Sequence, residues 1–225
     1  MDKATYETTK YIKGPMHQSL KHDSAHKHVA GSAEYIDDIP EPAGLLHGAL
    51  GMADRARAEI LSIDLSAVKA YPGVVCVLTA DDITGVNDVS SGGRHDEPLI
   101  ATDKIEFHGQ TIFAVIAETR DAARKAACLA KVEYRDLPFW TDIDGALDNG
   151  SPLVTPGMTL KRGMPETELD KAAHRIKSSM RIGGQEHFYL EGQVAAAIPS
   201  EDGMHILSST QHPTEIQHKV AHALH

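Results

Sequence analysis

Short apolar runs separated by polar turns fill the first 140 residues, a pattern typical of β-strands joined by short loops. A short helix is predicted within 64–69. A longer helix is capped by Thr119 or Asp121 and runs to about Ala130, where repeated alanines favour helix and permit close packing on a sheet. The predicted strands are 45–53, 59–63, 74–79, 110–117 and 132–134. The strand at 110–117, the helix that follows it and the strand at 132–134 form a strand–helix–strand unit.

A second set of elements follows a linker that contains a short predicted helix, Ile143–Leu147. Glu201–Asp202–Gly203 predicts a hairpin turn between the last two strands, and Pro213 occupies the favoured first position of a final helix. The predicted elements are a helix at 166–172, strands at 174–182, 189–198 and 205–208, and a helix at 214–224. Gly183–Gly184 would interrupt the first of these strands.

Two polar segments lie outside these elements. Residues 1–20 have mixed charge and are interpreted as a flexible N-terminal arm or an assembly contact. Residues 87–97 are rich in Ser, Gly and Asp without apolar anchors, which predicts a mobile loop.

The final helix carries an apolar stripe and reaches the last residue without a cap or stop signal. The stripe consists of Ile216, Val220, Ala223 and Leu224. Because an uncovered apolar surface promotes association, the sequence predicts self-association through this helix.

Composition excludes several classes of protein. The chain has 225 residues, 41% hydrophobic and 24% charged, as in an ordinary soluble protein with a real core. It contains no run of about 18 apolar residues, so no membrane partner is expected. The net charge of −10 disfavours a nucleic-acid partner. The N-terminal residues lack an apolar signal core, and we expect a cytoplasmic protein.

The two cysteines bear on redox chemistry. Cys76 and Cys128 both lie in apolar runs and are expected to be buried. Two thiolates cannot supply a four-cysteine iron–sulfur cluster. If the chain is part of a redox enzyme, its electron-transfer centres therefore belong to other chains.

The tripeptide Gly183–Gly184–Gln185 is the main candidate for a binding site. Two glycines allow the backbone to approach a bulky group closely. Gln185 then offers a neutral amide with both a donor and an acceptor, which can orient an anionic group without changing its charge. The alternative interpretation is a glycine bulge in a strand.

Histidine pairs offer a weaker hypothesis of metal binding. His218 and His222 lie one helical turn apart, as zinc ligands can. Catalytic zinc helices place a Glu between the two histidines, and here the sequence is His-Lys-Val-Ala-His. We therefore interpret these residues as surface histidines, and we expect no direct metal ligand in the chain.

Four motifs in order resemble the molybdopterin-binding subunit of the molybdenum hydroxylases, the xanthine dehydrogenase/aldehyde oxidase family. The most specific is the run Gly-Gly-Gln-Glu-His-Phe-Tyr-Leu-Glu at 183–191. The others are Gly-Ser-Ala-Glu-Tyr-Ile-Asp-Asp-Ile-Pro at 31–40, Phe-His-Gly-Gln at 107–110 with Val-Ile-Ala-Glu-Thr at 115–119, and Ser-Ser-Thr-Gln-His-Pro at 208–213. The resemblance runs from about Ser19 to the last residue.

The resemblance implies an α+β fold in two parts. Residues 21–140 would form an α/β hammerhead domain after the arm, and 141–155 would form a linker. Residues 156–225 would form the beginning of the molybdopterin-binding domain. The chain would then be the N-terminal portion of a larger subunit.

The resemblance also implies an activity. The family hydroxylates a carbon next to nitrogen in a heteroaromatic ring, with water as the oxygen source. Gln185 would hydrogen-bond an oxygen of the molybdenum centre, beside Gly183 and Gly184. The catalytic base is expected outside this chain, while Glu186 and Glu191 are interpreted as ion-pairing or solvated groups, with Glu191 facing the site as the alternative.

The implied cofactor is molybdenum-molybdopterin in the complete enzyme, and none is expected to bind stably to this chain alone. Iron–sulfur clusters and FAD would lie on other chains, and no nicotinamide or flavin motif is seen here. The implied partners are the rest of the molybdenum subunit, an iron–sulfur/FAD subunit and a purine substrate, with hypoxanthine or xanthine expected. The alternatives are an aldehyde oxidoreductase of the same family and a non-catalytic scaffold or assembly module.

Overall fold

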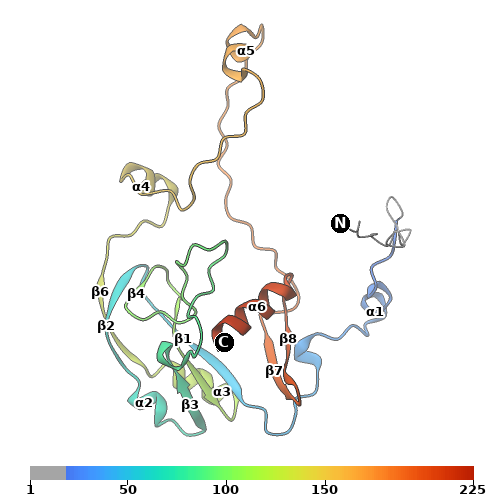
Figure 1. Cartoon of the computed structure of the whole chain (residues 1–225), viewed down its shortest axis with the longest axis vertical. Coiled ribbons are helices and arrows are strands. Elements are labelled where there is room, and N and C mark those ends of the chain that lie inside the picture. The colour runs from blue at the N-terminus through green and yellow to red at the C-terminus, as the bar shows by residue number, and fades with distance from the viewer. Residues whose placement is uncertain (1–18) are drawn as a thin grey trace, which may run out of the picture. The chain divides into compact units, whose positions relative to one another are not determined.

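The computed structural model describes residues 19–225 (Figure 1). The predicted arm at 1–20 lies almost entirely outside the described residues. The described chain forms two compact units. The larger unit contains Pro42–Tyr189 and His212–His225, and the smaller contains the residues up to Glu41 with Leu190–Gln211. Both units contain helices and strands, which confirms the predicted α+β class.

Two three-stranded antiparallel sheets form the centre of the larger unit. The first sheet has the order β1-β5-β3, with strands β1 (His47–Met52), β5 (Thr111–Ala117) and β3 (Val74–Leu78). The second has the order β4-β2-β6, with strands β4 (Lys104–Ile105), β2 (Ala58–Asp64) and β6 (Lys131–Asp136). The short helical elements of this region are α2 (Ser66–Lys69) and the 3₁₀ turn η2 (Ala80–Asp82). The five predicted strands of this region are confirmed, and β4 and η2 are additional.

Helix α3 (Arg120–Ala127) closes the core over the first sheet. Thr119 caps it, because its side-chain oxygen accepts a hydrogen bond from the backbone N–H of Ala122 at 3.1 Å. Ala123 and Ala126 are fully buried, so the absence of larger side chains lets the helix approach the strands. Phe113 and Val115 of β5 are buried in the same core. The alanine-rich sequence therefore allows the close helix–sheet packing that was predicted.

Gly51 of β1 is required by this core. A Cβ atom at Gly51 would lie 2.1 Å from ring carbons of Phe113, which is itself buried. We expect Gly51→Ala to lower the free energy of unfolding by about 1–3 kcal/mol, because overpacking forces buried groups to shift. At Gly48 of the same strand a Cβ atom would make an ordinary 3.6 Å contact with Ile116. Gly48→Ala is therefore the matched control in urea denaturation, and equal losses for the two variants would contradict this account.

Both cysteines are exposed, so their predicted burial is wrong. β3 is an edge strand, and a register shift between Val74 and Cys76 turns Val75 and Cys76 away from the core. Cys128 is the C-cap residue just after α3, which ends three residues earlier than predicted. An apolar run identifies a strand or helix but does not show which of its residues face the core.

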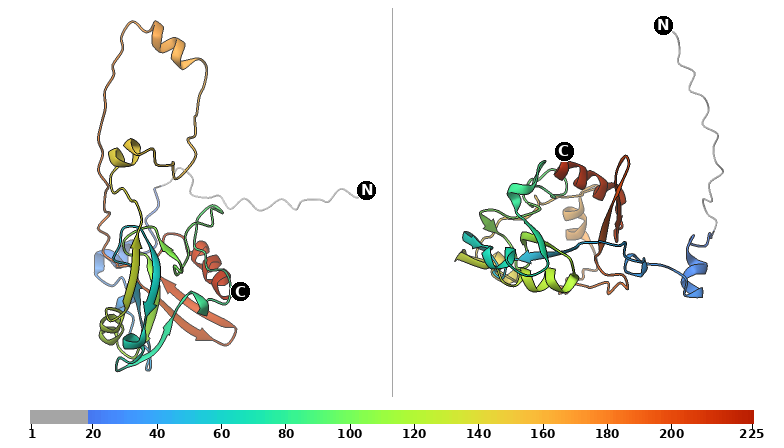
Figure 2. Two further views of the ribbon diagram at one scale, coloured as in Figure 1. Left: turned by 90° about the vertical axis from the view of Figure 1, so that its left-hand side faces the viewer. Right: turned by 90° about the horizontal axis from the view of Figure 1, so that it is seen from below.

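The chain between β6 and the last hairpin is mostly irregular (Figure 2). Helices α4 (Ile143–Asp148) and α5 (Pro165–Lys171) lie within it, close to their predicted positions. The predicted strand at 174–182 is absent, and residues 173–194 form no regular element. Ile176 is 97% exposed, and Met180 and Ile182 are also exposed. Alternating apolar residues favour a strand only when a neighbouring strand pairs with them.

The smaller unit is built around a hairpin of β7 (Ala195–Ser200) and β8 (Gly203–Ser208). Ser200 pairs with Gly203 across the turn, which confirms the predicted hairpin position. Helix α1 (Ala25–Ala30) and the 3₁₀ turn η1 (Ile36–Asp38), neither of them predicted, belong to the same unit. No helix within residues 19–225 combines the length and apolar character that a membrane crossing requires.

The final helix α6 (Pro213–Leu224) begins at Pro213 as predicted and belongs to the larger unit. The sequence at its C-terminal end carries no local cap signal, and backbone and side-chain groups of residues 84–86 bond its last carbonyls instead. Ile216, Val220 and Ala223 of the apolar stripe are partly covered, while Leu224 is exposed. Self-association through this stripe stays a prediction.

Candidate functional site

The predicted site residues Gly183, Gly184 and Gln185 lie in the irregular stretch between α5 and β7, and all three are exposed. There is no strand here for the glycines to interrupt, so the alternative of a glycine bulge does not describe this segment. The Gln185 amide is accessible to solvent rather than enclosed in the core. Its donor and acceptor groups can therefore meet a group supplied from outside the segment.

The two glycines leave open space beside the amide. A Cβ atom at Gly183 or Gly184 would meet nothing within 4 Å, and neither residue has the left-handed backbone conformation that favours glycine. Neither glycine is thus required by packing or by backbone angle within the described chain. What a missing side chain does provide is access for a bulky group to the backbone N–H and C=O groups. A neutral amide beside two open backbone positions can hydrogen-bond an anionic, oxygen-rich group without adding charge.

The residues that follow show one unusual backbone conformation and one local side-chain contact. Phe188 has a φ angle of 52°, which is uncommon for a residue other than glycine. Its backbone N–H donates to a carboxylate oxygen of Glu186 at 3.3 Å. Glu186 therefore contacts the backbone of Phe188, whose ring is exposed.

Glu191 has a separate structural role in the smaller unit. Its carboxylate accepts a hydrogen bond from the backbone N–H of Ile36 at 3.0 Å, in a partly buried position. Ile36 is the first residue of η1, so Glu191 satisfies a donor that has no partner inside that turn. This contact joins two motifs of the family resemblance, those at 31–40 and 183–191. The sequence gives no spacing signal for it, since the two residues are 155 positions apart.

The Phe107–Gln110 motif is structural. Gly109 has a φ angle of 89°, and Gln110 is buried with its side-chain oxygen accepting the backbone N–H of Glu106 at 2.8 Å. Gln110 thus closes the turn that leads into β5. The buried Gln110 thus gives this motif a structural role, while Phe107 is exposed.

The histidines do not gather into a metal centre within residues 19–225, where no group of three or more His, Cys, Asp or Glu side chains could hold a metal ion. His22 instead accepts the backbone N–H of Ser24 at 3.1 Å, and its ring lies 6.2 Å from that of His28. His218 and His222 are exposed, as predicted for surface histidines.

Two family models match the chain in succession. Residues 30–138 match the model described as "Aldehyde oxidase and xanthine dehydrogenase, a/b hammerhead domain", and residues 149–225 match the "Molybdopterin cofactor-binding domain". Xanthine dehydrogenase of Oryza sativa subsp. japonica is 38% identical over 211 residues, covering 92% of this chain and 15% of that protein. Aldehyde oxidase 2 of Rattus norvegicus is 37% identical over 216 residues, covering 95% and 16%.

Two solved structures of oxidoreductases are also similar to this chain. The aldehyde oxidoreductase from Desulfovibrio gigas is similar with a TM-score of 0.71 and 28% identity, over 84% of this chain and 23% of that chain. Quinoline 2-oxidoreductase from Pseudomonas putida 86 is similar with a TM-score of 0.72 and 26% identity, over 91% and 28%.

Fold and matched segments together define a hammerhead domain followed by molybdopterin-binding sequence, the arrangement of a molybdenum-dependent oxidoreductase. The chain belongs to the xanthine dehydrogenase/aldehyde oxidase family of molybdenum hydroxylases. It spans 15% and 16% of the length of the two curated relatives named above.

Proposed function

We propose that this chain forms part of the molybdenum subunit of an enzyme that hydroxylates a purine, hypoxanthine or xanthine, with water as the oxygen source. The observation that carries the proposal is the exposed Gln185 amide beside two positions without side chains. Xanthine dehydrogenases and aldehyde oxidases match the chain at similar identity, so an aldehyde is the alternative substrate.

In this proposal Gln185 orients the cofactor, and Gly183 and Gly184 let the backbone approach it. When bound, molybdenum-molybdopterin supplies the two-electron oxidation chemistry, and the protein supplies binding and orientation. A neutral amide suits this role because it can hydrogen-bond an anionic oxygen without adding charge. A carboxylate at the same position would repel that oxygen.

The catalytic base is proposed to come from outside this chain. General-base catalysis needs a carboxylate within reach of the proton that it removes. The two acidic residues of the 183–191 run are already engaged, Glu186 with the backbone N–H of Phe188 and Glu191 with that of Ile36. Iron–sulfur clusters and FAD are likewise proposed to lie on partner chains, and the exposed free thiols of Cys76 and Cys128 suit a reducing cytoplasm.

The test uses this chain alone and the assembled enzyme that contains it. We expect the isolated 225-residue chain to hold no stoichiometric molybdenum and to show no xanthine-dependent dye reduction, because its Gly183–Gln185 segment is exposed and does not enclose a cofactor. The assembled enzyme should hold molybdenum and reduce the dye with xanthine. Elemental analysis and dye-reduction assays measure both quantities.

The substrate class is decided in the same assay by replacing xanthine with an aldehyde. Faster turnover of the aldehyde than of xanthine would mean that the substrate is an aldehyde and not a purine. An assembled enzyme without molybdenum would reject the proposed function and favour a non-catalytic scaffold.

A further inference from the structure

The C-terminal end of α6 is held by residues that lie far earlier in the chain. The last carbonyls of a helix have no partner inside it and need one elsewhere. The backbone N–H of Val86 donates to the carbonyl of His222 at 2.7 Å, and that of Gly85 donates to the carbonyl of Ala223 at 3.0 Å. The Thr84 hydroxyl donates to the carbonyl of Leu224 at 3.0 Å. Three successive carbonyls are thus satisfied by three successive residues.

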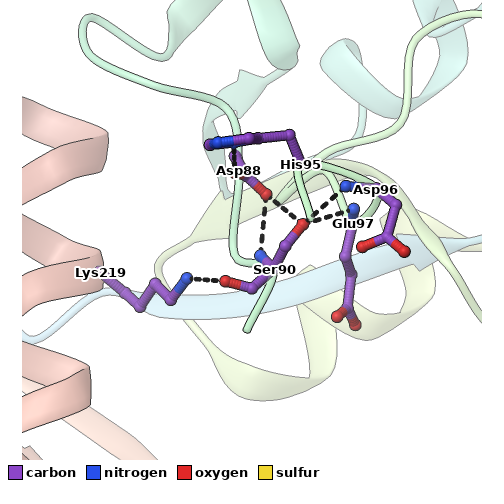
Figure 3. A network of polar contacts seen from close by, with 6 residues as sticks. All are labelled: Asp88, Ser90, His95, Asp96, Glu97 and Lys219. Atoms are coloured by element: carbon purple, nitrogen blue, oxygen red, sulfur yellow. Dashed lines mark hydrogen bonds and ion pairs between the residues drawn. The ribbon is translucent and has the colours of Figure 1, made fainter. Parts of the chain in front are cut away.

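Side chains extend this contact along the helix. The Lys219 ammonium donates to the backbone carbonyl of Ser90, as Figure 3 shows. One turn earlier, the Ser91 hydroxyl donates to a carboxylate oxygen of Glu215 at 3.4 Å. Contacts therefore run along α6 from its first turn to its end.

The loop that makes these contacts is internally ordered around Ser90, which is 5% exposed. The Ser90 hydroxyl accepts the backbone N–H groups of Asp96 and Glu97, each at 2.8 Å (Figure 3). Asp88 in turn accepts the Ser90 backbone N–H at 2.8 Å and contacts the His95 ring nitrogen at 2.6 Å. The Ser90 hydroxyl also donates to the Asp88 carboxylate, and this bond, followed by the one from the Ser90 backbone N–H, lowers the pKa of Asp88 to about 2. The predicted mobile loop is instead tied at several points, and the Ser90 carbonyl that Lys219 meets is held in place.

Gly85 shows that the loop and the helix fit closely. A Cβ atom at Gly85 would lie 2.1 Å from the carbonyl oxygen of His222 and 2.9 Å from the carbonyl carbon of Ala223. Both are backbone atoms that cannot rotate away. The φ angle of Gly85 lies outside the left-handed region, so a side chain is excluded here by α6 and not by local conformation.

We propose that residues 84–97 form a clamp for α6, which joins the hammerhead segment and the end of the molybdopterin-binding segment into one cooperative unit. The clamp lies within the first family match and α6 within the second. Lys219 fastens the middle of the helix, and residues 84–86 fasten its end. This inference is independent of any role of Gln185.

Hydrogen–deuterium exchange on the 225-residue chain tests the clamp. Lys219→Met removes the ammonium donor and keeps an unbranched side chain of similar length. We expect backbone amides of 84–97 and of α6 to exchange faster together, by on the order of tenfold, the size expected for the loss of one hydrogen bond from a charged group. Amides of β5 should be unchanged. Lys177→Met, at an exposed position of the irregular stretch, is the matched control.

Gly85→Ala provides a second, independent variant. It should accelerate exchange in the same two segments, because the added methyl group has to displace the helix end. Gly157→Ala, where a Cβ atom meets nothing within 4 Å, is its control. Should Gly85→Ala fail to fold, Lys219→Met still decides the matter. Faster exchange in only one of the two segments, or in neither, would overturn the clamp.

Discussion

Replacing Gln185 with alanine in the assembled enzyme is expected to lower turnover about 10–100-fold, the usual loss when a group that orients a metal centre is removed. The fold should be little affected, because Gln185 is exposed and exposed substitutions generally change stability by no more than about 0.5 kcal/mol. Turnover with xanthine, molybdenum content and thermal unfolding are to be measured on the same preparations.

Two further variants sharpen this experiment. Gln217→Ala removes the same amide from an exposed position of α6 and should leave turnover unchanged. Gln185→Glu keeps the shape and adds a negative charge, so it should lower turnover at least as much as the alanine variant. Normal turnover of Gln185→Ala, or aggregation of that variant, would remove the proposed role of the amide.

Phe113→Ala should have the largest effect on stability, a loss of about 3–5 kcal/mol in the free energy of unfolding. The ring is 1% exposed and is the largest fully buried side chain in the described chain. Its removal leaves a cavity between the first sheet and the rest of the core. Because a domain is commonly stable by only about 5–15 kcal/mol, this loss removes a large share of the stability.

Phe107→Ala is the matched control, since the same ring is 48% exposed there. Urea denaturation followed by circular dichroism compares the midpoints of the two variants. Similar midpoints would mean that Phe113 does not belong to the core that holds the sheets together.

The strands of the first half could be predicted because each has its own apolar run, and such a run is a local property of the sequence. Helix α3 (Arg120–Ala127) was equally clear, since its cap Thr119 and its alanines act within a few residues of one another. The outward position of Cys76 was not predictable, because it depends on how β3 pairs with β5. The same limit explains the absent strand at 174–182, whose alternation specifies two faces but supplies no neighbouring strand.

The candidate site shows a similar division. Gln185 was found from a contiguous motif, and its exposure agrees with a role in binding, which stays a prediction. The Glu191 contact with Ile36 and the Lys219 contact with Ser90 join positions more than a hundred residues apart. Gly85 carried a weak signal, a glycine outside any predicted turn. The need for glycine at this position comes from the nearby backbone of α6, and that proximity is visible only in the three-dimensional structure.

Thr84 and Leu224 are in contact although they lie 140 positions apart, and this separation affects the order of folding. Ribosomal synthesis proceeds from the N-terminus, so residues 84–86 leave the ribosome well before the segment that they are to hold. Pairings between distant positions form slowly, because a large loop must close first. Helix α6 is therefore expected to become protected from hydrogen exchange later than the strands of the two sheets. Until then the backbone amides of Gly85 and Val86 lack their partners on α6.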